Sequence, residues 1–148
     1  MGDHATVARE LLATARSLAD RPDGETRGLW PRAAVLLARQ SLEVALKTYW
    51  SAKAAGVEEA SLRAQLLCLG TWVSDEPFAR RAHQAWSALS RASHHHPYEL
   101  TPTRDELVGW FDTVLEVVEV TEAACRTGPG TPGRRSYLRR APRTLDHK

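Results

Sequence analysis

Cysteines, long apolar runs and alternating strand patterns are scarce in this sequence of 148 residues, and each scarcity excludes a class of protein. The two cysteines, Cys68 and Cys125, lie far apart without a metal-binding spacing, so we expect neither a disulfide scaffold nor a thiolate metal cluster. No apolar run approaches the roughly 20 residues of a membrane-spanning helix. The N-terminus lacks a basic segment followed by an apolar one, so we expect no signal peptide, no membrane association and a cytoplasmic protein.

Charge and composition divide the chain into two parts. The net charge is +2, but residues 127–148 contain six basic residues against one aspartate, which leaves residues 1–126 mildly acidic. From Thr127 onward Gly, Pro, Ser and Arg dominate, a composition that cannot bury a core. The sequence therefore predicts one folded domain over residues 1–126 and a disordered basic tail over residues 127–148.

Apolar residues recur at helical spacing through the predicted domain, and no pattern of period two competes. We expect an all-α compact bundle of four to five helices, because turn and capping signals divide this pattern into five segments. The first segment starts with Asp3 as its N-cap, the second runs from Pro31 to a cap at Gly56, and the third runs from about Glu58 to about Val73. The fourth follows residues 74–77, and the fifth follows residues 103–106 and ends near Arg126.

The second and fifth segments carry the longest apolar stripes, and we expect these stripes to face each other. Thr103 and Glu106 fit a capping box at the start of the fifth segment. Five tryptophans are many for this length. Most lie on or beside the apolar stripes, but Tyr49 and Trp50 are adjacent, so one of them should be exposed or at an interface.

Chemically versatile side chains gather between the fourth and fifth segments, where Arg91, His94, His95, His96 and Tyr98 fall within eight residues. One interpretation is structural, because protonated imidazoles suit the negative end of a helix. A metal site is disfavoured, since neighbouring residues on a helix point about 100° apart and three adjacent histidines do not converge on one ion. We therefore expect no metal and no cofactor.

RNA cleavage is the third interpretation of this stretch. Metal-free cleavage needs a base for the 2′-hydroxyl proton, a cation for the phosphate and an acid for the leaving oxygen. Imidazole titrates near neutral pH and serves as base or acid. Guanidinium matches two phosphate oxygens with a planar fork.

The order Arg91, four residues, His96, one residue, Tyr98 resembles the R-x4-H-x-Y signature of HEPN-domain ribonucleases. The second segment is similar to a HEPN helix in which Glu43 is followed by Leu46-Lys47 and then by Gly56-Val57. The likeness covers roughly residues 5–125. It implies an all-α, HEPN-like bundle that forms a homodimer and cleaves RNA without metal.

The resemblance also implies roles for individual residues. Arg91 would bind the scissile phosphate, His96 would act as acid or base, and His94 and His95 are secondary candidates. Tyr98 would be the residue that a partner nucleotidyltransferase modifies with AMP, as in toxin–antitoxin pairs. The protein would then be a toxin or defence effector whose antitoxin is that nucleotidyltransferase.

The rival interpretation is a non-catalytic HEPN-like module for dimerisation or as an adaptor. Active members of the family usually carry Asn, Asp or His directly after the arginine, and this sequence has Ala92 there. Under this interpretation the motif would be kept only as part of the cleft structure.

Overall fold

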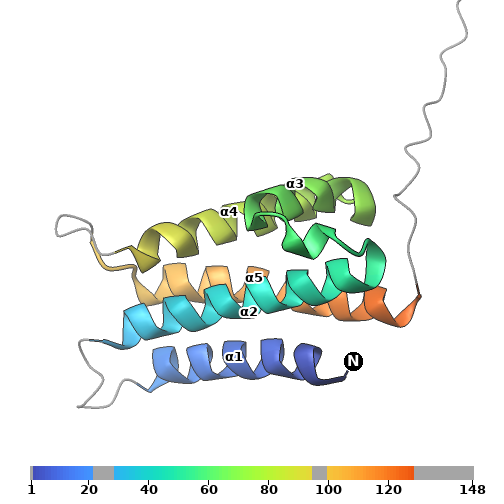
Figure 1. Ribbon diagram of the computed structural model, residues 1–148. Coiled ribbons are helices and arrows are strands. Elements are labelled where there is room, and N and C mark those ends of the chain that lie inside the picture. The colour runs from blue at the N-terminus through green and yellow to red at the C-terminus, as the bar shows by residue number, and fades with distance from the viewer. Residues whose placement is uncertain (1, 22–28, 95–99, 129–148) are drawn as a thin grey trace, which may run out of the picture.

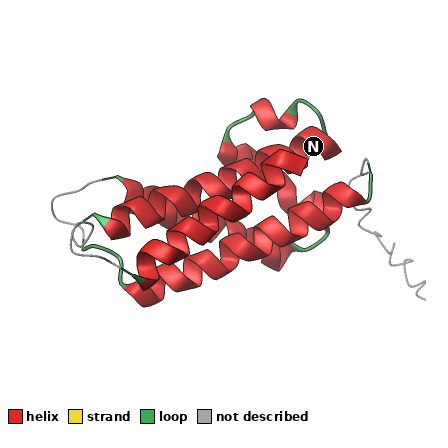
Figure 2. Cartoon of the chain, turned by 90° about the horizontal axis from the view of Figure 1, so that it is seen from below, coloured by secondary structure: helices red, strands yellow, loops and turns green. Residues whose placement is uncertain are grey.

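The computed structural model describes residues 2–21, 29–94 and 100–128. Five α-helices form the described part, and their bounds are α1 Gly2–Asp20, α2 Trp30–Lys53, α3 Leu62–Val73, α4 Glu76–Ser93 and α5 Arg104–Arg126. A short 3-10 turn, η1, spans Val57–Glu59. Figure 2 shows helices as the only regular structure drawn over these residues. The predicted all-α bundle is therefore confirmed, whereas the predicted tail from residue 129 onward lies outside the described residues.

Local capping explains where α2, α4 and α5 begin. Pro31 occupies the first turn of α2, where its missing N–H is not needed. The Asp75 side chain accepts a hydrogen bond of 3.0 Å from the backbone N–H of Phe78. Thr103 and Glu106 form the expected capping box, in which each side chain bonds the other residue's backbone. These three starts are as predicted.

Three predicted helix boundaries are wrong. Helix α1 begins at Gly2, so Asp3 lies in its first turn and is not its N-cap. Helix α2 ends at Lys53, and Gly56 adopts a left-handed φ of 103° in the connection to η1. Helix α3 begins only at Leu62, because Ser61 caps it by accepting a hydrogen bond from the backbone N–H of Ala64. Between residues 54 and 61, the left-handed Gly56 and the Ser61 cap therefore set the helix boundaries, and the apolar spacing did not.

The core is built around α2, which packs against α1, α3, α4 and α5. Its predicted stripe is fully or almost fully buried, and comprises Val35, Ala38, Leu42, Ala45, Leu46 and Tyr49. Helix α5 packs against α2, α1 and α4. Leu107, Phe111, Val114, Val117 and Val118 form its buried face. The predicted packing of the second against the fifth helix is confirmed.

The prediction that Tyr49 or Trp50 is exposed is wrong. Tyr49 is 3% exposed and Trp50 is 0% exposed. The two rings make an edge contact at 4.9 Å, and Trp50 makes a second edge contact with Trp72 at 5.6 Å. Helix α2 has neighbours on several sides, so adjacent residues pointing in different directions both become buried.

The helices run lengthwise through the bundle, which gives the molecule two distinct ends (Figure 1). The start of α2, the end of α4 and the start of α5 share one end, and Arg104 of α5 bonds Asp20 of α1 there at 2.6 Å. The start of α1 and the ends of α2 and α5 share the other. Lys53 bonds the Thr127 hydroxyl and the Gly128 carbonyl there, at the point where the C-terminal segment leaves. No helix among the described residues is both long and apolar enough to cross a bilayer.

Candidate functional site

The Arg/His stretch begins at the end of α4. Arg91 lies in the last turn of α4, and its side chain is exposed. His94 is the C-cap residue, its backbone N–H bonds the Arg91 carbonyl at 3.1 Å, and its side chain is also exposed. His95, His96 and Tyr98 lie outside the described residues. Arg91 and His94 are therefore the two predicted site residues that the structure places.

Arg91 differs from most arginines that lie along the helix interfaces. Five of those guanidinium groups bond a carboxylate, namely Arg9, Arg16, Arg39, Arg81 and Arg104. Within the described part of the chain, no acceptor bonds the Arg91 guanidinium. An exposed guanidinium without an acceptor keeps its donor fork available for an anion from solution.

A groove of about 440 Å³ lies beside Arg91, between the end of α4 and the start of α5. It is lined by Ala88, Arg91 and Ala92 of α4, residues 100–103, and Glu106 and Trp110 of α5. Leu100 on its rim is 97% exposed. Both helix ends are at the same end of the bundle, as Figure 1 shows. The groove thus places a free cation next to apolar walls and one carboxylate.

Glu106 is held in place by the capping box. Its Oε2 accepts hydrogen bonds from the Thr103 backbone N–H at 2.8 Å and from the Thr103 hydroxyl at 3.0 Å. These two bonds stabilise the charged form and hold the pKa of Glu106 below its ordinary value. Within the described residues no donor reaches Oε1. The groove therefore contains an ionised carboxylate with one oxygen still free to accept.

Trp110 is half-buried and packs against the core along one part of its surface. It lies one helical turn after Glu106, so both residues belong to the same face of α5. Sequence reasoning assigned Glu106 to the helix cap and Trp110 to the apolar stripe. Their i,i+4 spacing indicated that they share one face of α5. It did not predict the groove, because the groove forms only where α4 packs beside α5.

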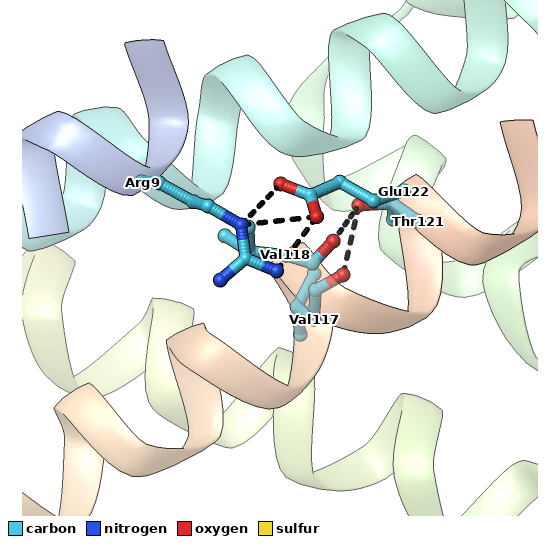
Figure 3. A network of polar contacts seen from close by, with 5 residues as sticks. All are labelled: Arg9, Val117, Val118, Thr121 and Glu122. Carbon is cyan, nitrogen blue, oxygen red and sulfur yellow. Dashed lines mark hydrogen bonds and ion pairs between the residues drawn. The ribbon is translucent and has the colours of Figure 1, made fainter. Parts of the chain in front are cut away.

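A second cavity, of about 480 Å³, lies at the opposite end between α1, α2 and α5. Its main polar feature is the pair of Arg9 and Glu122, in which Nε and Nη2 of Arg9 donate to both Glu122 oxygens at 2.7–3.0 Å. Thr121 beside it donates to the Val117 and Val118 carbonyls (Figure 3). The Arg9–Glu122 pair fastens α1 to α5, and the Thr121 hydroxyl is bonded within α5, so we assign no ligand to this cavity.

No set of three or more His, Cys, Asp and Glu residues gathers in a metal-binding arrangement over the residues described. In the second-helix segment that resembles the HEPN helix, Glu43 bonds Arg39 at 2.8 Å and Lys47 is exposed. Those residues form a solvated face of α2. The groove beside Arg91 is therefore the part of the described structure that combines a predicted site residue with an open surface.

Comparisons of the chain with protein-family models, with curated proteins and with solved structures find no match.

Proposed function

We propose that this protein is a metal-independent, HEPN-type endoribonuclease whose site lies at the end of α4. The observation that carries the proposal is the exposed Arg91 guanidinium, which has no acceptor among the described residues and borders an open groove. Arg91 precedes His96 by five positions and Tyr98 by seven, in the order of the HEPN signature. The proposal combines this cation and the groove beside it with the imidazole of His96, which lies outside the described residues.

The proposed reaction uses the RNA's own 2′-hydroxyl as nucleophile. The O2′–P bond forms as the P–O5′ bond breaks, a histidine takes the 2′ proton, and the leaving 5′ oxygen receives a proton. His96 is the imidazole proposed for this transfer. Arg91 would bond two phosphate oxygens and offset the charge that builds up on them. The products are a 2′,3′-cyclic phosphate, which can open to a 3′-phosphate, and a 5′-hydroxyl.

Two proton transfers are simplest with two imidazoles, which motivates the proposed homodimer. In it, Arg91 and His96 of both copies would line one cleft near the two-fold axis. We further propose a cytoplasmic toxin or defence role, with Tyr98 as the target of AMP transfer by a nucleotidyltransferase antitoxin. Light scattering at micromolar concentration should give twice the chain mass, and a strict monomer would count against the shared cleft.

An adaptor module is the second candidate, and the surroundings of Ala92 favour it. Active HEPN enzymes usually carry a polar residue there, whereas Ala92 packs its methyl group against the core. No side chain at this position can therefore assist Arg91 with a hydrogen bond. An adaptor would keep the helical surface and bind partners without cutting RNA.

Expression of wild type, Arg91→Ala and His96→Ala distinguishes the two candidates. For a nuclease, wild type should arrest growth and fragment cellular RNA, and both variants should lose these effects with their helical circular dichroism intact. Arg80→Ala is the matched control, because Arg80 is exposed on the same helix, lies outside the groove and has no acceptor among the described residues. Chelation with EDTA should leave cleavage unchanged. If purified wild type never cuts RNA, the adaptor interpretation replaces the nuclease.

A further inference from the structure

Two side chains in the groove are not used by the proposed cleavage chemistry. Glu106 and Trp110 lie four residues apart on α5, and both line the groove that Arg91 borders. Residues at this spacing are neighbours on a helix surface, with Cβ atoms about 5–6 Å apart. The groove therefore presents an aromatic surface and a carboxylate side by side, across from a free guanidinium.

Trp110 lies among apolar groups, with Ala88, Ala92 and Pro102 lining the same groove. A flat aromatic ring beside small apolar side chains suits the face of a nucleobase, because unpaired bases in RNA stack on exposed aromatic rings. The ring is half-buried and packed against the core, so its position is fixed before a ligand arrives. Stacking alone would accept any base.

Glu106 adds selectivity for one base edge. Its Oε2 is already engaged by Thr103, at 2.8 Å and 3.0 Å, while Oε1 has no donor among the described residues. A carboxylate only accepts hydrogen bonds, so the ligand edge must bring N–H groups. Guanine offers two adjacent donors, N1–H and the N2 amino group. Adenine and cytosine place an acceptor nitrogen beside their amino group, and uracil places carbonyls on both sides of its N–H.

We propose that this groove binds an unpaired guanine base of RNA, with Trp110 under the ring and Glu106 at its Watson–Crick edge, next to the phosphate held by Arg91. The proposal rests on the proposed function, because Arg91 supplies the phosphate contact. Glu106 and Trp110 are specificity residues in this arrangement. The same carboxylate would repel a phosphate placed at its end of the groove, which fixes the direction in which the nucleotide lies.

Binding can be measured apart from cleavage with fully 2′-O-methylated oligonucleotides, which lack the nucleophile. The probes are U-rich ten-nucleotide strands that carry a single G, A, C or inosine at the centre, and the readout is fluorescence anisotropy. The G strand should bind about fivefold or more tightly than the all-U strand, as expected for a two-donor contact. Inosine lacks the N2 amino group and should fall between the two. Equal affinities for G and inosine strands would contradict the contact with Glu106.

Substitutions of Glu106 and Trp110 test whether these two residues cause the preference for the G strand. Glu106→Gln keeps the capping box, because glutamine also serves at that position, but it loses the carboxylate. It should reduce the preference for G below about twofold. Trp110→Leu should weaken binding of every strand, and Trp110→Phe should restore most of it. Trp72→Leu, a tryptophan outside the groove, should leave RNA binding unchanged.

The failures of the two proposals can be told apart. If unmodified RNA is cut without base preference, the guanine groove is wrong and the nuclease stands. If the Glu106→Gln variant still binds the G strand preferentially, the guanine groove is also wrong. If methylated strands show the preference but unmodified RNA stays intact, the nuclease is wrong and the groove is a guanine-binding site. If the wild-type protein binds no strand even at a 100-fold molar excess of protein over oligonucleotide, the groove proposal is overturned.

Discussion

Among individual residues, what separates Arg91 from the paired arginines such as Arg9 is its neighbours and not its type. Arg9 is bonded on two of its nitrogens by one carboxylate, and Glu122 together with nearby Glu119 raises the pKa of Arg9. The Arg9 guanidinium therefore serves the contact between α1 and α5. Arg91 has no acceptor in the described part of the chain, so its charge and its fork remain available.

Arg91→Lys tests whether the fork matters or only the charge. Lysine keeps a positive charge but cannot bond two phosphate oxygens with a planar group. Initial cleavage rates of a labelled RNA should fall for Arg91→Lys and fall further, by about 10² or more, for Arg91→Ala. Equal rates for wild type and Arg91→Lys would show that the residue acts only as a point charge.

Glu106 predicts how stability responds to pH. Its bonds from Thr103 lower the pKa of the folded state below the ordinary value of 4.5. A group with a lowered folded pKa stabilises the protein fully above its unfolded pKa, and this contribution is lost as pH falls through the folded pKa. The difference in free energy of unfolding between wild type and Glu106→Gln, which does not titrate at this position, should therefore shrink from pH 7 to pH 3. Urea titrations at several pH values measure it, and a constant difference would mean that the Thr103 bonds are not made in solution.

Among the helices, α2 determines the fold because each of the other four packs against it. Its small residues also let helices approach closely, and the buried Ser41 hydroxyl donates to the Ala8 carbonyl of α1 at 2.7 Å. Ion pairs then fasten α5 to α1 and α4, with Arg16 to Asp112 at 2.7 Å and Arg81 to Glu116 at 2.6 Å. Removing apolar volume from α2 should therefore cost more than removing it from any exposed face.

Two leucines of α2 provide a matched comparison. Leu42 is 0% exposed and Leu36 is 40% exposed. Leu42→Ala should lower the free energy of unfolding by about 2–5 kcal/mol, because it leaves a cavity in the core. Leu36→Ala should lower it by much less, since water already reaches that side chain. Urea denaturation measures both, and similar losses would contradict the central position of α2.

For the whole molecule, the proposed RNA site and the last described residue, Gly128, lie at opposite ends of the bundle. The proposed RNA site lies at the end where α5 begins, and the C-terminal segment leaves where α5 stops. The 23 residues of α5 separate them by roughly 34 Å. We expect the basic residues beyond Gly128 to act on RNA through long-range attraction.

Deleting residues 129–148 tests this expectation. The cut preserves Thr127 and Gly128, which Lys53 bonds at the end of α2. The melting temperature should stay nearly unchanged, because the deleted segment has almost no apolar periodicity to bury. Five net positive charges are lost, so RNA affinity should fall and become less sensitive to salt. A large drop in melting temperature would show instead that the segment packs on the domain.

The sequence by itself determined the helices, because apolar spacing and short-range capping act within one or two turns. Thr103 and Glu106 are three residues apart, so their capping box could be recognised from letters alone. Only the tertiary structure decided which residues meet across the bundle. Arg9 and Glu122 are 113 positions apart, so their contact leaves no local signal in the sequence. The burial of both Tyr49 and Trp50 depends on how many helices surround α2. The groove beside Arg91 likewise exists only because α4 ends where α5 begins, which brings a free guanidinium to Glu106 and Trp110.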